Sequence, residues 1–338
     1  MAYSRLEARD WARANLRGCC GCLLPTFTGD LHGINEQAIR FDVAREKELG
    51  MSGALVVAEC GTSKEELLDV TRIAVDEAAG GLNVVVHAVL PTLEDNIELV
   101  KRSEELGAEL VLVSYPLTFY PASEQEVLEY TKTLAESTNL ALIVFAMHLW
   151  NFRRLHPSHF SPSLIGRMIE EIPNVAVVKN EVGGPGVGGI AEVFQRFHEE
   201  VVITDPIESN SPAWALTYGL QWIGSSNYEA YGPWVPRYFE LLREDRVDEA
   251  MEIYWKLQPV READAAVVGQ ALAGTQMVPR YLWKYQGWLN GFNGGPLRAP
   301  QMRINDGQMR QLRAGAVAAG LDVTETPDSR FLVGRNPA

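Results

Sequence analysis

The sequence has no long apolar segment and no cluster of basic residues. No stretch of its 338 residues approaches the apolar length of a membrane span. The opening residues, MAYSRLEARDWARANLRG, mix both charge signs and lack the apolar core of a signal peptide. The formal net charge is -14, and no Lys/Arg stripe reverses it locally. We therefore expect a cytoplasmic protein that binds neither nucleic acid nor membrane.

Cysteine is scarce, and its pattern argues against a metal site. The four cysteines are Cys19, Cys20, Cys22 and Cys60, and GCCGC contains a C-x-x-C spacing. A zinc site needs further ligands, but the sequence has no second cysteine pair and no H-x-H or H-E-x-x-H spacing. A thioredoxin-like motif would open a helix, whereas CCGCLLP is typical of a strand. We expect small buried thiols in a first strand and no metal.

Short apolar runs alternate with amphipathic segments of helical length from residue 19 onward. The eight runs are CCGCLL, GALVVAE, NVVVHAVL, ELVLVSYP, LALIVFAMH, VAVVKNE, VVITD and LQWIGSS. They lack strict polar alternation, which predicts strands buried on both faces and hence a parallel sheet. Eight such strands, each followed by a helix, favour a (β/α)8 barrel, with a doubly wound sheet as the alternative.

Local signals predict helix ends and the limits of the barrel. Serine followed three residues later by glutamate is typical of a capping box, and glycine is common after a last helical turn. These signals are Ser63 with Glu66, Ser123 with Glu126, Gly50 and Gly107. We predict an N-terminal segment over 1–16, the barrel over 17–245, C-terminal helices over 246–321 and a poorly ordered polar tail over 322–338.

A barrel of this kind places its functional residues at the carboxyl ends of its strands. That rule selects Glu59 and Cys60, His87, Ser114 and Tyr115, His148, Lys179, Asp205, and Ser225 with Ser226. Lys179 follows the apolar run NVAVV on the sixth predicted strand. A partly desolvated lysine favours its neutral form, which attacks a carbonyl to give a Schiff base. An exposed lysine is the commoner outcome of such a pattern, and Glu181 nearby would favour the charged form.

The glycine-rich segment and two histidines each admit two interpretations. The segment GGPGVGG contains G-x-G-x-x-G from Gly184 to Gly189, but its place as the sixth unit favours a close-packed loop over a dinucleotide site. His148 is either a general acid/base or a hydrogen-bonded structural histidine, and His87 carries a weaker version of the same choice. No G-x-S-x-G motif is present, since GSSNYEAYG does not match it.

Taken in order, these features resemble the dihydrodipicolinate synthase / N-acetylneuraminate lyase superfamily over residues 17–321. LLPTF is similar to its first-strand turn, YPLTFYPASEQEVLEYTKTLAEST to its fourth strand and following helix, NVAVVKNE to its lysine-bearing strand and GGPLRAP to the start of its last helical region. The resemblance implies that Lys179 forms the Schiff base. GSSNYEAYGP and the long C-terminal part are similar to the hydratase-aldolases that act on aromatic benzylidenepyruvates.

The sequence also departs from this family. Its G-T-T-G-E motif, which holds the substrate carboxylate, is replaced by the shorter VVAECGTSKEE, which lacks the threonine pair. Either Glu59 stands for the glutamate of the motif, or Cys60 and Gly61 occupy the places of the threonines. The tyrosine that relays protons in the family corresponds by strand register to Phe145, which cannot carry a proton. The double tyrosine of the fourth strand corresponds to Leu117 and Thr118, which leaves Tyr115 and Tyr120 nearby but shifted.

These considerations predict a Schiff-base lyase in which Lys179 reacts with a 2-oxo acid such as pyruvate. His148 is the first candidate for proton transfer and Tyr115 the second, while the pocket is lined by Glu59, Cys60, His87, Phe145, Asp205 and Ser226. Trp150 and Phe152 suggest an apolar or aromatic partner. No cofactor is needed, because the iminium is itself the electron sink. Alternatives are a hydro-lyase that uses the same iminium and a non-catalytic metabolite-binding barrel. The resemblance implies a homotetramer.

Overall fold

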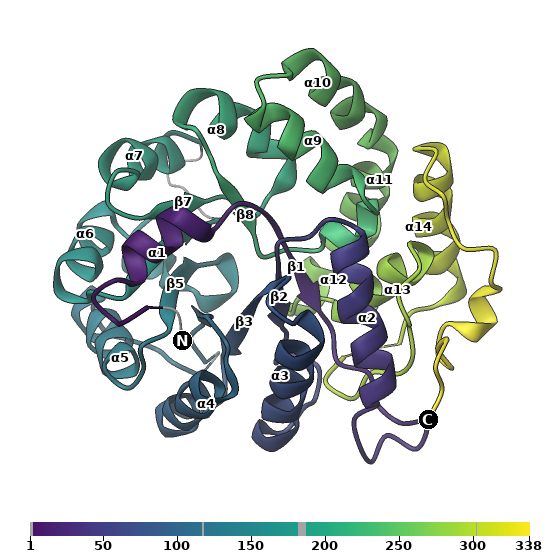
Figure 1. The fold of residues 1–338 in the computed structure, drawn as a ribbon, viewed down its shortest axis with the longest axis horizontal. Helices are drawn as coiled ribbons and strands as arrows, with labels where there is room; N and C mark the ends of the chain where they lie inside the picture. Colours follow the sequence, from purple (N-terminus) through teal and green to yellow (C-terminus); the bar gives the residue numbers. More distant parts are fainter. Residues whose placement is uncertain (1–2, 117, 182–186, 302) are drawn as a thin grey trace. The chain divides into compact units, whose positions relative to one another are not determined.

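The computed structural model describes residues 3–116, 118–181, 187–301 and 303–338. The chain folds as two compact units (Figure 1). Unit 1 comprises Met1–Gly18 and Asn83–Gly224, and unit 2 comprises Cys19–Leu82 and Ser225–Ala338. Within the described ranges, none of the helices combines the length and apolar character needed to cross a bilayer.

Unit 1 contains six of the eight predicted strands. They are β3 (Asn83–Ala88), β4 (Leu110–Val113), β5 (Ala141–Ala146), β6 (Val175–Asn180), β7 (Val202–Thr204) and β8 (Trp222–Gly224). The first five lie side by side in the order β3-β4-β5-β6-β7, and each neighbouring pair is parallel. Every residue of β4 to β8 is buried, which is why these runs read as continuously apolar rather than alternating.

Helices α4 to α7 flank the strands of unit 1 on their outer side (Figure 1). The helices of this unit are α1 (Ala8–Asn15), α4 (Leu93–Leu106), α5 (Glu124–Glu136), α6 (Pro162–Glu171), α7 (Val187–Phe197) and α8 (Ser211–Tyr218). Short 3-10 helices cover His148–Trp150, Phe152–Arg154 and Glu208–Asn210. Ser123 caps α5 by accepting from the Glu126 backbone N–H, but the Glu126 carboxylate accepts from Ala122, so the predicted capping box is only half formed.

The N-terminal segment is fastened to the amino ends of the unit 1 strands. Arg9 donates from Nε to the carbonyl oxygen of Val175 at 3.0 Å and from Nη2 to that of Ile172 at 3.0 Å. The backbone N–H of Ala141, the first residue of β5, donates to the Tyr3 hydroxyl at 2.8 Å. The N-terminal segment therefore occupies the end of unit 1 opposite to the carboxyl ends of β5 and β6.

Unit 2 contains the first two strands and the C-terminal helices. The strands, β1 (Gly18–Leu23) and β2 (Gly53–Val56), pair in parallel. The helices are α2 (Glu36–Glu48), α3 (Lys64–Ala78), α9 (Trp234–Arg243), α10 (Val247–Lys256), α11 (Gln258–Asp264), α12 (Gln270–Thr275), α13 (Arg280–Leu289) and α14 (Asp306–Ala318). A π-helix spans Ala265–Gly269, and 3-10 helices span Tyr228–Tyr231 and Asp328–Arg330.

Most of the predicted helix ends in unit 2 are confirmed. Ser63 and Glu66 form a full capping box at the start of α3, and Gly50 follows α2 with φ +84°. Gly107 likewise ends α4 of unit 1 in the left-handed region. The predicted helical segment 246–264 divides into α10 and α11 near Pro259, which lacks the N–H that a continuous helix requires.

The prediction that residues 322–338 form a poorly ordered tail is wrong. Phe331 is buried and meets the Tyr285 ring edge-to-face, with 5.3 Å between centroids. Arg335 donates from Nε to the Phe292 carbonyl at 2.9 Å, and the Asn336 backbone N–H donates to Asn293 Oδ1 at 2.8 Å. A single apolar anchor and these side-chain bonds hold a segment whose overall composition is polar.

Candidate active site

Lys179 is the fifth residue of β6 and follows four fully buried positions. Only 5% of its surface is exposed, and its Nζ atom lies 4.0 Å from the centroid of the Phe145 ring. Its register partners are Phe145 on β5 and Thr204 on β7. The lysine therefore stands at the carboxyl end of its strand, inside the protein, with an aromatic face against its amine.

Strand alternation identifies the side chains that share the face of Lys179. The row of partners His87, Leu112, Ile143 and Val177 runs across β3 to β6 and lies two residues before Lys179 on its own strand. Residues two apart on a strand point to the same side of a sheet. Ser114 follows Leu112 by two residues, and its hydroxyl lies 2.9 Å from His87 Nε2. The buried His87–Ser114 pair thus belongs to the same face as Lys179.

Tyr115 lies on the opposite face, towards helix α5. Its hydroxyl donates to Thr131 Oγ1 at 2.5 Å, because Thr131 uses its own proton on the Val127 carbonyl. The Tyr115 ring is fully buried among other rings, including Phe119 at 5.6 Å and Phe152 at 5.3 Å between centroids. Burial raises the pKa of the Tyr115 phenol, and the bond to Thr131 opposes that effect only in part. These contacts are those of a packing residue.

Asp205 follows β7 and fastens the loop that comes after it. Its carboxylate accepts from the Ile207 backbone N–H at 2.9 Å, Asn210 Nδ2 at 2.9 Å and Trp214 Nε1 at 2.8 Å. Burial raises the pKa of this carboxyl, while these bonds and the charge of Lys179 act in the other direction. Its hydrogen-bonding capacity is largely used by residues of its own loop and of α8.

The segment after β5 brings aromatic rings to Phe145. His148 begins a 3-10 helix that ends at Trp150, but the side chain of His148 lies outside the described part of the structure. The Trp150 ring meets Phe145 edge-on with 4.9 Å between centroids. Phe152 is fully buried and belongs to the rings around Tyr115 instead. Of the glycine-rich motif, residues 184–186 fall outside the described residues.

In unit 2, Glu59 and Cys60 follow β2 and are already engaged. Arg280, the first residue of α13, donates to Glu59 Oε2 from Nε at 3.0 Å and also from Nη2. Burial raises the pKa of the Cys60 thiol to about 12, in spite of the nearby cations Arg280 and Lys284. Cys60 is therefore a protonated, buried thiol at neutral pH. Ser226, after β8, is half-buried, and its carbonyl accepts from Tyr228 at 3.0 Å.

The structure confirms the interpretation of the cysteines. All four are buried thiols outside disulfide bonds, and three of them lie on β1. Among the residues that the structure describes, no group of three or more His, Cys, Asp or Glu side chains could hold a metal ion. The C-x-x-C residues Cys19 and Cys22 are buried within β1, as the strand pattern predicted.

Sequence reasoning missed a second buried lysine, Lys284 on α13. Its Nζ donates to the Pro25 carbonyl at 2.6 Å and to Thr26 Oγ1 at 2.9 Å, both just after β1. Burial lowers the pKa of this amine to about 8, and the charge of Asp42 opposes that shift. The residue sits within the aromatic helix RYLWKYQGWL, where no spacing marks it as functional.

The chain is similar in sequence and in fold to known proteins. The family model described as the dihydrodipicolinate synthetase family matches residues 33–277. A 4-hydroxy-tetrahydrodipicolinate synthase of Methanopyrus kandleri is 26% identical over 257 residues, which cover 73% of this chain and 81% of the relative. An N-acetylneuraminate lyase of Fusobacterium nucleatum is 23% identical over 299 residues, which cover 87% of this chain and 96% of the relative.

A solved structure shows that the similarity extends to the fold. The crystal structure of N-acetylneuraminate lyase from Fusobacterium nucleatum aligns with a TM-score of 0.73 at 21% identity, covering 89% of this chain and 98% of that one. Together with the order of strands and helices, this likeness confirms the predicted (β/α)8 barrel with a C-terminal helical extension. The doubly wound alternative is excluded.

Proposed function

The chain belongs to the dihydrodipicolinate synthetase family, and from that premise we propose that Lys179 is the Schiff-base lysine of a lyase acting on a 2-oxo acid such as pyruvate. Membership confirms the predicted family and enzyme class, a lyase of the class I aldolase type. The observation that carries the assignment to Lys179 is its place at the carboxyl end of β6. The residue is buried and lies on the face of the sheet opposite to Tyr115 and helix α5. Catalytic residues of such barrels come from these strand ends.

The proposed chemistry requires the neutral form of the Lys179 amine as the nucleophile. The Lys179 nitrogen attacks the carbonyl carbon of the oxo acid, and loss of water gives an imine whose protonated form withdraws electrons. Removal of a proton from the adjacent carbon then gives an enamine, which adds to an aldehyde and forms a C–C bond. Hydrolysis returns the lysine, and the reverse sequence cleaves the same bond. The Phe145 ring supports the attack step by excluding water from one side of the amine.

Proton transfer needs a group other than Phe145. We assign it to His148, whose backbone lies just beyond β5, three residues after Phe145. The His87–Ser114 pair is the second candidate, since it shares the face of Lys179. Tyr115 receives no proton-transfer role in this proposal, because its hydroxyl is bonded to Thr131 on the helix side.

The reaction partner in this proposal is an apolar aldehyde. Its support is the Trp150 ring, which packs against Phe145 beside the amine. Glu59 and Asp205 are not assigned to the substrate carboxylate, since each already holds its own partners. We also propose that the protein assembles as a homotetramer, as the family resemblance implies, and light scattering tests that assembly directly.

Borohydride trapping tests the proposed function. The wild-type protein is reduced with borohydride in the presence of pyruvate, and the modified peptide is located by mass spectrometry. We expect one stable adduct on Lys179, none in Lys179→Arg, and an undiminished adduct in Lys101→Arg, an exposed control on α4. Lys284 serves as an internal comparison, because it is also buried. An adduct on Lys284 alone, or on surface lysines alone, contradicts the assignment.

Turnover by the untreated protein separates the lyase from the hydro-lyase. With a candidate hydroxy-oxo acid as substrate, release of an aldehyde identifies C–C cleavage, whereas retention of the whole carbon skeleton with loss of water identifies dehydration. We expect aldehyde release. Failure to form any adduct with pyruvate or with aromatic 2-oxo acids would instead favour a metabolite-binding barrel.

A further inference from the structure

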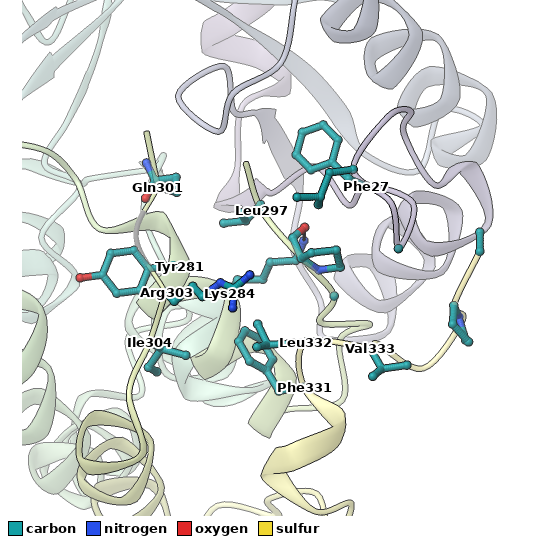
Figure 2. Close-up of a pocket in the computed structure, with 16 residues that line it drawn as sticks. Phe27, Tyr281, Lys284, Leu297, Gln301, Arg303, Ile304, Phe331, Leu332 and Val333 are labelled. Atoms are coloured by element: carbon teal, nitrogen blue, oxygen red, sulfur yellow. Dashed lines mark hydrogen bonds between the residues drawn. The ribbon is translucent and has the colours of Figure 1, made fainter. Parts of the chain in front are cut away.

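Unit 2 contains a cavity of about 330 Å³ beyond the end of β1. Its walls come from the loop after β1, from α13, from the segment that precedes α14 and from the C-terminal residues (Figure 2). Apolar side chains form most of the lining, namely Phe27, Leu31, Leu297, Ile304, Phe331 and Leu332. The volume lies within the range of small-molecule sites, and the surface suits an apolar body.

Two cations break this apolar lining. Figure 2 shows Lys284 in the middle of the cavity, between Phe27 on one side and Phe331 and Leu332 on the other. Arg303 also lines the cavity, and its side chain is exposed. Both side chains are positively charged, whereas most of their neighbours in the lining are apolar. The charged group of a ligand would therefore lie beside these two residues.

The charge that acts on the Lys284 amine is that of Asp42, which does not line this cavity. The three acceptors of Lys284 Nζ are uncharged: the Pro25 carbonyl, Thr26 Oγ1 and, at 3.5 Å, the Pro296 carbonyl. Arg303 makes neither a hydrogen bond nor an ion pair with any described residue. No Asp or Glu side chain lines the cavity. The backbone oxygen of Ala338, which also lines the cavity, accepts from the Gly29 backbone N–H at 2.8 Å.

We propose that this cavity, which does not have Lys179 among its lining residues, binds a small organic monocarboxylate with an aromatic or branched aliphatic body. The carboxylate would bond to Arg303, whose guanidinium matches it in two-point geometry, and would gain from the charge of Lys284. The apolar body would lie against Phe27, Leu297 and Phe331. A monoanion suits the site better than a phosphate, since a doubly charged group loses more hydration on entering an apolar cavity.

This arrangement connects the ligand to the end of β1. Lys284 donates hydrogen bonds to Pro25 and Thr26. An anion in the cavity would favour the protonated form of Lys284, which is the form that donates all of these bonds. The 3.5 Å contact with Pro296 is the weakest of the three and is the one that a carboxylate oxygen would replace. The ligand therefore would stabilise the loop after β1.

Calorimetric titration of the full-length protein tests the proposal, with 3-phenylpropionate as the probe and 3-phenylpropanamide as its uncharged match. We expect the acid to bind at least about tenfold more tightly than the amide. Arg303→Gln should weaken binding of the acid at least about fivefold, while Arg310→Gln, an exposed arginine on α14, should not. Leu297→Trp, which fills the cavity, should abolish binding in a variant whose thermal unfolding remains cooperative.

The result is independent of the proposed function. Lys179→Arg should bind the acid as the wild type does, even if Schiff-base formation fails. Equal affinity for acid and amide, unchanged affinity in Arg303→Gln, binding retained in Leu297→Trp or binding lost in Lys179→Arg would each overturn the proposal. Displacement of the acid by millimolar chloride or phosphate would overturn it as well, because the site would then be one for inorganic anions.

Discussion

The amine nitrogen of Lys179 lies 4.0 Å from the centre of the Phe145 ring, and the two residues are register partners on β6 and β5. By family resemblance, a proton-carrying tyrosine belongs at the position of Phe145. The phenyl ring keeps the packing of that side chain but supplies no hydroxyl. In the proposed mechanism, proton transfer therefore falls to a residue other than Phe145, and this requirement leads to the first prediction.

Substituting His148 by Ala should impair proton transfer more than imine formation. We expect the exchange of the pyruvate methyl protons with deuterium, followed by NMR, to fall about 100-fold, while borohydride still traps the Lys179 adduct. Phe145→Tyr, introduced into the His148→Ala background, should raise the exchange rate about tenfold above that of His148→Ala alone. Phe145→Leu in the same background should not raise it. Exchange at the wild-type rate in His148→Ala would remove this histidine from the mechanism.

Tyr115→Phe should change stability but not catalysis. The substitution removes the hydroxyl that donates to Thr131 at 2.5 Å and leaves the ring packing in place. We expect the free energy of unfolding to fall by about 1–2 kcal/mol, measured in urea, with the exchange rate within about twofold of the wild type. An exchange rate reduced by more than about tenfold, at unchanged stability, would restore Tyr115 as a proton carrier.

The contrast between Lys179 and Tyr115 shows what the sequence could reveal about the site. The strand that carries Lys179 was predicted from its apolar run, and the resemblance of NVAVVKNE to the lysine-bearing strand of the family is what singles out the lysine. The run ELVLVSYP is apolar at every position of the strand, so it does not tell which of Ser114 and Tyr115 faces the helices. The deciding information is the contact of Tyr115 with Thr131, a residue of the following helix.

The ion pair between Glu59 and Arg280 should be strongly coupled. The side chains are only 25% and 7% exposed, so removal of one partner leaves a largely buried charge. We expect Arg280→Met to lower the free energy of unfolding by about 3 kcal/mol, and the double variant with Glu59→Gln to recover at least about 1.5 kcal/mol. Urea unfolding of all four proteins measures this coupling. Additive effects of the two single substitutions would show that the charges act independently.

The carboxyl groups of Glu46 and Glu229 should make stability depend on pH. Both are buried beside Gly21, where an added Cβ would lie 2.8 Å from Glu46 Oε2 and still closer to Glu229. Burial, and then the charge of Glu229, raise the pKa of Glu46 well above its usual range. At pH values between the pKa of Glu46 in the unfolded chain and its higher pKa in the folded protein, only the unfolded chain has lost this proton. The free energy of unfolding therefore falls as the pH rises through that range.

Glu46→Gln should therefore become more favourable relative to the wild type as the pH rises. We expect its stability advantage to grow by up to about 1.4 kcal/mol per pH unit between pH 5 and pH 8, since glutamine does not titrate. Guanidinium unfolding at both pH values measures the difference, with Glu48→Gln on the exposed side of the same helix as the control. Parallel pH dependence in Glu46→Gln and the wild type would contradict the assignment of the buried proton.

Contacts between distant parts of the sequence were beyond prediction. Glu59 and Arg280 are 221 positions apart, and Lys284 reaches Thr26 across 258. Neither pairing leaves a local pattern, because a charged residue in an apolar helix looks the same whether its partner is water or a buried acceptor. The strands, by contrast, were predictable one by one, since each lies within a short apolar run that ends where the chain leaves the sheet.

The proposed function depends on a covalent bond between Lys179 Nζ and the substrate. A crystal structure of the protein soaked with pyruvate tests it most directly. We predict continuous density from Lys179 Nζ to the second carbon of pyruvate, with the Phe145 ring against the new imine. Pyruvate bound without a covalent bond, or a Lys179 amine pointing away from the bound pyruvate, would rule out Lys179 as the Schiff-base lysine.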